Sequence, residues 1–213
     1  VTAHGGIRLL LTGHLEQAEA AGRLLVALHD AQPDPENRYL TVWDTTAKGL
    51  FTDYGDVEDV PWGDGSQLIR DNPLGGNAYW DIGYVLAFLS SLFRVTRDRE
   101  FLRVAEELFA IASQYSGFQN HVWKTPWGCA ALYQATGNSH YLETALAMAD
   151  EILTCQQDDG GFFLGDQSCY VDDSEQQWSY AFNDYDELRA NPAILMDTAA
   201  QMMHYLGQVR AVL

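Results

Sequence analysis

Basic residues are scarce in this sequence. Its 213 residues include 12 Lys and Arg against 30 Asp and Glu, which gives a formal net charge of −18 at pH 7. A surface this acidic repels nucleic-acid phosphates and anionic lipid headgroups, since cations are what bind both. We therefore expect no nucleic-acid partner and no membrane partner. Polyanionic substrates are disfavoured too, unless a pocket is locally basic.

Long apolar runs are also missing. No stretch reaches the ~20 uninterrupted apolar residues of a membrane-spanning helix, and no basic segment followed by an apolar one opens the chain. Hydrophobic residues nevertheless make up 47% of the chain, which is enough for a core. The sequence predicts one soluble, cytoplasmic domain over residues 1–213, whose start at Val1 indicates a trimmed N-terminus.

Metal-binding and nucleotide-binding motifs are absent as well. The three cysteines, Cys129, Cys155 and Cys169, have no metal-ligand spacing. A disulfide between Cys155 and Cys169 stays open beside the simpler interpretation of reduced thiols. The acidic stretch 53–64 lacks the EF-hand spacing, so we interpret it as a solvated loop. No Walker, GxGxxG, HExxH or GxSxG motif occurs, and we predict no metal and no organic cofactor.

Three segments of the chain follow one plan, in which an apolar helix, a tight turn and an amphipathic helix succeed each other. The turns begin at Thr12, Thr96 and Thr136. The last two lie 40 residues apart, a spacing typical of repeated helix pairs. The first two are separated by about twice that spacing. We place the extra length in a long loop at 40–75, with a short β-hairpin through YLTVWD and GLFTDY.

The two helices of each pair differ in their apolar pattern. In the second helices apolar residues recur on one face, as at Leu102, Ala105, Phe109 and Ala112. The first helices, such as VLAFLSSLF and WGCAALY, are apolar almost all round and should be covered on every side. These patterns predict an all-α fold of helical hairpins, an α/α toroid with inner and outer layers. About three and a half pairs are present, so we expect a ring that is partial, or one that is completed by missing sequence or by another chain.

Two stretches carry a resemblance to known families. YWDIGYVLAFLSSLFRVTRDREFLRVAEEL and TPWGCAALYQATGNSHYLETALAMADEILTCQQDDGGFF resemble the repeat of terpenoid-cyclase-like α/α toroids, and are equally similar to six-hairpin carbohydrate enzymes such as the unsaturated glucuronyl hydrolases. LTCQQDDGGFF resembles the glutamine–tryptophan motif of squalene and hopene cyclases, with Phe163 where that family prefers Trp. The DxDD and DDxxD motifs of terpene cyclases are absent, which weakens the hypothesis that this chain performs their cation-cascade cyclisation.

A toroid has a cavity at the mouth where its inner helices begin, and the loops there are rich in aromatic residues. Aromatic walls with few ionisable groups describe a ligand pocket. The predicted substrate-binding residues are Trp43, Tyr79, Trp80, Trp123, Trp127, Phe163, Tyr170 and Trp178.

Four residues are candidates for proton transfer. Asp81 stands between Trp80 and Tyr84, where desolvation would raise the pKa of its carboxyl and suit a general acid. A helix-capping role for Asp81 stays open. His121 is the candidate base, and Asp44 and Glu175 are reserve carboxylates. The remaining histidines are interpreted as surface or packing residues; they are His4, His14, His29, His140 and His204.

These residues lead to an enzyme hypothesis. We expect cofactor-independent acid–base catalysis, as an isomerisation, cyclisation, elimination or hydrolysis, on an uncharged small molecule such as a terpenoid or polyketide-like natural product. One alternative is a six-hairpin carbohydrate hydrolase, epimerase or lyase. The other is a non-catalytic helical-repeat module that binds a peptide on its concave face. The sequence leaves the oligomeric state open, including a homodimer.

Overall fold

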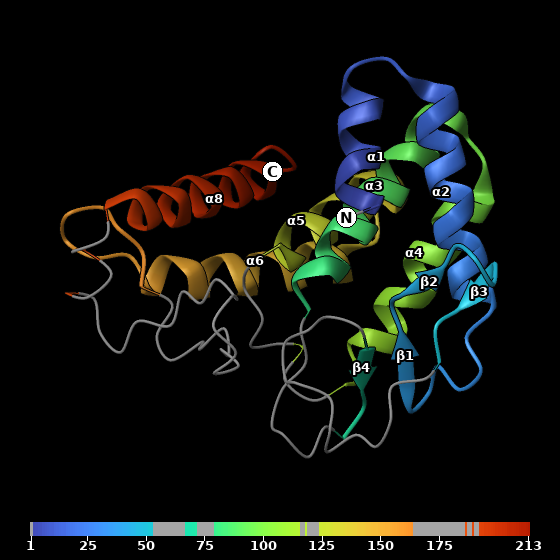
Figure 1. The fold of residues 1–213 in the computed structure, drawn as a ribbon. Helices are drawn as coiled ribbons and strands as arrows, with labels where there is room; N and C mark the ends of the chain where they lie inside the picture. The colour runs from blue at the N-terminus through green and yellow to red at the C-terminus, as the bar shows by residue number, and fades with distance from the viewer. Residues whose placement is uncertain are drawn as a thin grey trace.

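The computed structural model describes residues 2–52, 67–71, 79–115, 118, 124–163, 186, 189 and 192–213, with the backbone alone at 80, 81, 192–195, 197 and 198. These residues form seven helices and four short strands (Figure 1). The helices are α1 (Thr2–Leu11), α2 (Leu15–Asp30), α3 (Trp80–Thr96), α4 (Arg99–Ala112), α5 (Thr125–Thr136), α6 (Ser139–Thr154) and α8 (Pro192–Arg210). Among the described helices, none has the length and apolar character to cross a bilayer.

The turns that join α3 to α4 and α5 to α6 have the same structure, 40 residues apart. In each, a threonine hydroxyl at the helix end, from Thr96 or Thr136, donates a 2.8 Å hydrogen bond to the carbonyl four residues earlier. The N-cap side chains that follow, Asp98 and Asn138, each accept the backbone N–H two residues further on at 3.1 Å. The tight turns predicted at these two threonines are therefore confirmed.

The residue after each threonine has a left-handed backbone. The angle φ is +82° at Gly13, +63° at Arg97 and +73° at Gly137. Glycine adopts this conformation without cost, whereas the Cβ of arginine is strained there. The first turn shares the threonine hydroxyl bond, which Thr12 donates at 2.8 Å, but His14 makes no side-chain cap. The three turns thus share one backbone shape and differ in their capping side chains.

The predicted β-hairpin is also present. Strands β2 (Trp43–Asp44) and β3 (Gly49–Leu50) pair antiparallel, with Trp43 opposite Leu50. A second antiparallel pair, β1 (Arg38–Leu40) with β4 (Gln67–Ile69), was not predicted and sets Tyr39 opposite Leu68. Both pairs lie beside α2 and α4, on the side of the molecule away from α8 (Figure 1).

Helices α3 and α5 are parallel and meet backbone to backbone. A Cβ at Gly83, in the first turn of α3, would overlap the carbonyl group of Lys124 at the start of α5. A Cβ at Gly128 would lie 2.8 Å from the Gly83 carbonyl oxygen. At the other ends of the helices, Arg94 donates a hydrogen bond to Gln134. Both helix starts and both helix ends therefore match, and glycine makes this close approach possible.

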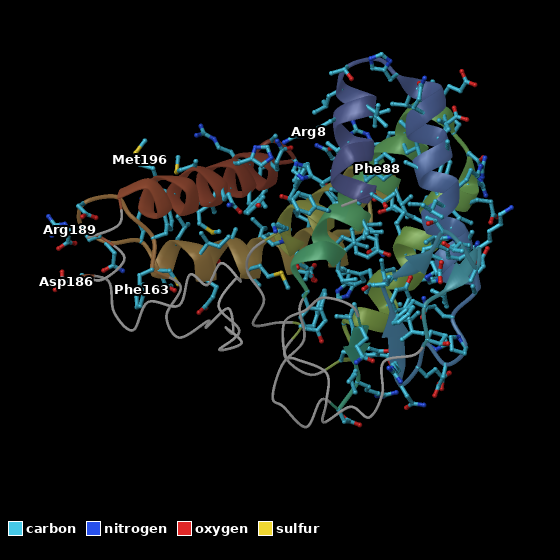
Figure 2. The ribbon with its side chains drawn as sticks, in the orientation of Figure 1. Arg8, Phe88, Phe163, Asp186, Arg189 and Met196 are labelled. Carbon is cyan, nitrogen blue, oxygen red and sulfur yellow. The ribbon has the colours of Figure 1, made fainter. Side chains whose placement is uncertain are left out.

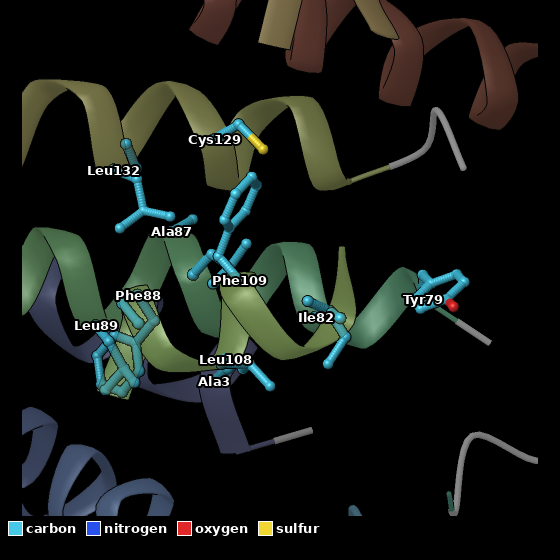
Figure 3. Packing of buried hydrophobic residues seen from close by; sticks show 14 of the residues in the cluster. Ala3, Tyr79, Ile82, Ala87, Phe88, Leu89, Leu108, Phe109, Cys129 and Leu132 are labelled. Carbon is cyan, nitrogen blue, oxygen red and sulfur yellow. The ribbon is translucent and has the colours of Figure 1, made fainter. Parts of the chain in front are cut away.

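The middle parts of α3 and α5 are buried, as the apolar patterns of these two first helices predict. Residues 86–90 of α3 and 128–132 of α5 are buried without interruption. Helix α3 packs against α1, α4 and α5, and helix α5 packs against α3, α6 and α8. Figure 3 shows part of the buried cluster, to which α3 contributes Phe88 and Leu89, α4 contributes Leu108 and α5 contributes Leu132. The core of the described chain therefore centres on α3 and α5.

The left-handed turns predict opposite effects for a matched pair of substitutions. Arg97→Gly should stabilise the protein by about 1 kcal/mol, because it removes the Cβ strain. Gly137→Ala should destabilise it by about 1 kcal/mol, and no heavy atom lies within 4 Å of the new Cβ to add a steric effect. Urea unfolding measures both changes. An Arg97→Gly protein no more stable than wild type would contradict this account of the turn.

The contact between α3 and α5 predicts a large loss of stability for Gly83→Ala. The added methyl group meets backbone that cannot move away, so the helices must separate, at a cost of about 3 kcal/mol or more. Gly5→Ala in α1 is the control, because no atom lies within 4 Å of its Cβ. That change should raise stability by roughly 0.5–1 kcal/mol through helix propensity. Equal effects of the two substitutions would contradict the proposed packing.

Candidate functional site

The predicted site residues fall into three groups. Five lie outside the described residues, namely Trp123, Tyr170, Trp178, His121 and Glu175. Trp80 and Asp81 are described by their backbone alone, which forms the first turn of α3. The side chains that the structure places are those of Trp43, Asp44, Tyr79, Trp127 and Phe163.

Trp43 and Asp44 belong to the β2–β3 hairpin. The Asp44 carboxylate accepts the backbone N–H groups of Thr46 at 2.7 Å and Ala47 at 3.0 Å, so it stabilises the hairpin turn. Trp43 is half-buried against the core. Figure 1 shows this hairpin beside α2, so the structure does not bring these two residues together with Trp127 on α5.

Tyr79 and Phe163 are packed into different parts of the chain. Tyr79 is buried directly before α3, with its ring edge-on to Phe118 at 5.4 Å. Phe163 is half-buried after α6, and its backbone N–H donates to the Cys155 carbonyl at 3.0 Å. Figure 2 shows Phe163 near the beginning of α8, far along the molecule from α1. These two aromatic residues therefore do not share one wall.

Trp127 lies in a line of rings that crosses four helices. His4 of α1 stacks on Tyr84 of α3, with ring centroids 4.8 Å apart and planes 6° from parallel. Tyr84 meets Trp127 of α5 edge-on at 5.8 Å. Trp127 in turn contacts His204 of α8 edge-on at 5.1 Å and stacks with Tyr205 at 6.3 Å. We name these five residues the aromatic row.

The aromatic row is open to solvent over much of its length. Tyr205 is buried, Tyr84 and Trp127 are half-buried, and His4 and His204 are exposed. Partly exposed rings at this spacing offer flat apolar faces and polar edges. Such a surface can hold a planar or ring-shaped ligand.

Positive charge gathers at the α1 end of the aromatic row. The Lys124 ammonium lies over the Tyr84 ring, 4.8 Å from its centroid. Partial burial is the first cause that lowers the pKa of His4, and the positive charges of Arg8 and Lys124 lower it further. Both causes favour the neutral form of the His4 imidazole.

A second polar cluster lies on the other side of the core. The buried ring of His29 is hydrogen-bonded to the Tyr39 hydroxyl at 3.1 Å and to the Glu107 carboxylate at 3.0 Å. Arg103 donates to the same carboxylate at 2.7 Å. Burial strongly raises the pKa of Tyr39, whose ring is 3% exposed. This cluster joins α2, β1 and α4, and its buried phenol gives a substrate no access.

Metal ligands do not gather in the described part of the chain, where no three His, Cys, Asp or Glu side chains are close enough to hold an ion. Cys129 and Cys155 are free thiols there, and burial raises the pKa of Cys129 to about 12. Cys169, the other half of the disulfide left open above, lies outside the described residues.

The sequence pointed to Trp127 and to the wall beside Tyr84, whereas it gave no sign of the ring contacts of Tyr205. His4 and His204, interpreted as surface or packing residues, are exposed and also contact rings of the row. The signal was present, because each of α1, α3, α5 and α8 contributes a ring to the row. Recognising the row requires knowing how the four helices are aligned with one another. The spacing of residues within a single helix does not give this alignment.

Comparisons of this chain with protein-family models, with curated protein sequences and with solved structures found no match. Its function is therefore argued from the geometry of its own residues, and above all from the aromatic row, since fold class alone does not determine activity.

The charges around His4 predict its titration. The pKa of His4 should lie below 6.5, and Arg8→Gln should raise it because one like charge is removed. Proton NMR of the imidazole across pH 4–9 measures both values. The folded chain binds this proton more weakly than the unfolded chain. The stability that His4 contributes is therefore present above pH 6.5 and is lost as the pH falls. An unchanged pKa in the variant would contradict this electrostatic picture.

Proposed function

We propose that this protein is an α/α-toroid enzyme that uses side-chain acid–base catalysis on a small molecule bound along the aromatic row. The observation that carries the proposal is the row itself, which runs unbroken from His4 on α1 to His204 on α8. Rings supplied by four separate helices, and still partly exposed, are a costly use of apolar surface unless a ligand covers them.

The arrangement of the helices supports the toroid. The hairpins α1–α2, α3–α4 and α5–α6 follow one another, and α1, α3, α5 and α8 are neighbours in that order. The parallel contact of α3 with α5 is the geometry expected of adjacent inner helices. In this proposal the aromatic row lines the inner surface, and α2, α4 and α6 form the outer layer.

Asp81 is the proposed proton donor. It occupies the first turn of α3, three residues before Tyr84, and residues at that spacing share one face of a helix. Its backbone lies two residues before Gly83, whose contact with Lys124 joins the starts of α3 and α5, and this supports the choice of Asp81 as the donor. His121 remains the proposed assisting base, with Glu175 in reserve. Asp44 is not kept as a reserve carboxylate, because it binds the turn of the β2–β3 hairpin. The reaction is an isomerisation, cyclisation, elimination or hydrolysis, without a cofactor.

A carbohydrate hydrolase, epimerase or lyase is the second candidate. The half-buried rings of Tyr84 and Trp127 favour it, because sugar rings pack against aromatic side chains as readily as polycyclic natural products do. The two candidates share the aromatic row and the carboxylic acid, and they differ in the ligand that should bind.

A ligand screen and two variants test the proposed function. Neutral sugars, terpenoids and polyketide-like lactones are screened by thermal shift, since a ligand that binds only the folded state raises Tm. Trp127→Ala should weaken binding of any true ligand about tenfold, because a stacking face is lost. For a compound that is also converted, Asp81→Asn should lower kcat by roughly 10²–10⁴-fold while binding persists.

The control is Trp43→Ala, which removes the same side chain from the β2–β3 hairpin. It should leave ligand affinity unchanged, with circular dichroism verifying that each variant is folded. Binding of sugars alone would select the carbohydrate enzyme. Full turnover by Asp81→Asn would disprove the assignment of the proton donor. Equal affinity of the Trp127→Ala protein would show that the aromatic row is not the binding surface.

A further inference from the structure

Helix α8 is apolar on two opposite faces. Met202, Tyr205 and Val209 are buried, on the side where α8 packs against α5 and α6. Successive residues of a helix are rotated by about 100°, so the opposite side is formed by residues spaced four, three and four apart. These residues are Met196, Ala200, Met203 and Gly207, and we name them the methionine stripe.

The methionine stripe is open to solvent. All four of its residues are exposed, Met196 by 71% and Met203 by 59%. A Cβ added to Gly207 would have no heavy atom within 4 Å. Figure 2 shows Met196 on the side of α8 that points away from α6. Large apolar side chains that share one line on a helix surface are typical of a contact with another protein surface.

The other helices that pack on one face only have charged outer faces. Helices α2, α4 and α6 expose carboxylates there, namely Glu16, Asp30, Glu100, Glu107, Glu143 and Asp150. Among the described exposed residues of α8 from 196 to 209, by contrast, none is Asp, Glu, Lys or Arg. A helix that is apolar on both sides is covered on both sides. This contrast singles out the outer face of α8 as a surface for a partner.

The uncharged character of the methionine stripe bears on which partner can cover it. Each chain carries a net charge of −18, so two copies repel each other wherever their acidic faces meet. The outer faces of α2, α4 and α6 are therefore unsuited to self-association. On the methionine stripe, two copies can meet without burying a carboxylate.

The order of large and small residues suits an antiparallel pair of α8 helices. When residue 201 of one copy lies opposite residue 202 of the other, Met203 faces the partner's Ala200. In the same arrangement Met196 faces the partner's Gly207. Each methionine then fills the space that a small residue leaves, and a two-fold axis repeats both contacts. The stripe is therefore complementary to itself.

We propose that two copies of this chain form a dimer through the methionine stripe, with their α8 helices antiparallel. This inference goes beyond the proposed function and does not rest on it. A helix of 19 residues is about 28 Å long, and one face of it buries less surface than a standard protein–protein interface. We therefore expect a reversible dimer with a Kd on the order of 10 µM.

Sedimentation velocity of the intact chain, at concentrations from about 1 to 300 µM, tests the dimer. The weight-average mass should rise from that of one chain toward that of two. The association should tighten at about 0.5 M NaCl, because salt screens the repulsion between two acidic chains. A mass that stays at one chain throughout would overturn the proposal and leave the methionine stripe to a partner other than this chain. An association that weakens in salt would overturn it as well, because the contact would then be ionic.

A charge placed in the stripe locates the interface. Met203→Glu should keep the chain monomeric over the whole concentration range, because dimerisation would bury an unpaired carboxylate. Val95→Glu is the matched control, since it adds the same charge to another exposed apolar residue, near the end of α3. That control should dimerise like the wild type, with circular dichroism verifying both folds. Equal association of the two variants would overturn the assignment of the interface to α8.

A mixture of two variants tests the antiparallel pairing. Ala200→Lys and Met203→Glu should each be monomeric alone, because each brings a charge without a partner into the contact. In an equimolar mixture the new ammonium group of one chain faces the new carboxylate of the other, so a mixed dimer should form. A mixture that stays monomeric while the wild type dimerises would overturn the antiparallel arrangement.

Discussion

The structure depends on the contact of two backbones, those of α3 and α5. Gly83 and Gly128 remove the side chains that would otherwise hold these helices apart. Their approach sets Tyr84 and Trp127 edge-on at 5.8 Å and carries Lys124 to the Tyr84 ring. The aromatic row is continuous only because this contact fixes the distance between its two central rings. The close approach of α3 and α5 therefore controls both the packing of the core and the spacing of the rings at the surface.

The local features of the fold could be predicted from the sequence, since they depend on residues close together in the chain. Thr96 and Thr136 mark helix ends because their hydroxyls bond within the last turn. The β2–β3 hairpin was recognised from its strand-like flanks. The β1–β4 pair was missed, because it joins Tyr39 to a partner almost thirty residues away, and nothing in either segment specifies that pairing.

The candidate site could be predicted only in part, for a related reason. Trp127 was identified because a tryptophan at the start of an apolar helix is conspicuous by itself. His4 and His204 were interpreted as surface or packing residues, and both are exposed. Their contacts with rings of neighbouring helices could not be predicted, because each histidine stands alone in its own helix. Asp44 was considered for catalysis on its sequence neighbours, whereas its carboxylate closes the hairpin turn. The type of a residue tells which chemistry its side chain can perform. Only the packing of the helices decides which of these side chains lie close enough to act together.

The matching turns have a consequence for how such a chain can grow. Each is closed by hydrogen bonds among about nine consecutive residues, for example from Leu92 to Glu100. In the turn between α3 and α4, Asp98 is also paired with Arg23 of α2. A duplicated hairpin would thus form its own turn, and it would need only a matching helix face to pack against. A chain of this kind could therefore lengthen by whole helical hairpins. Each added hairpin would offer a position for one more ring beside the aromatic row.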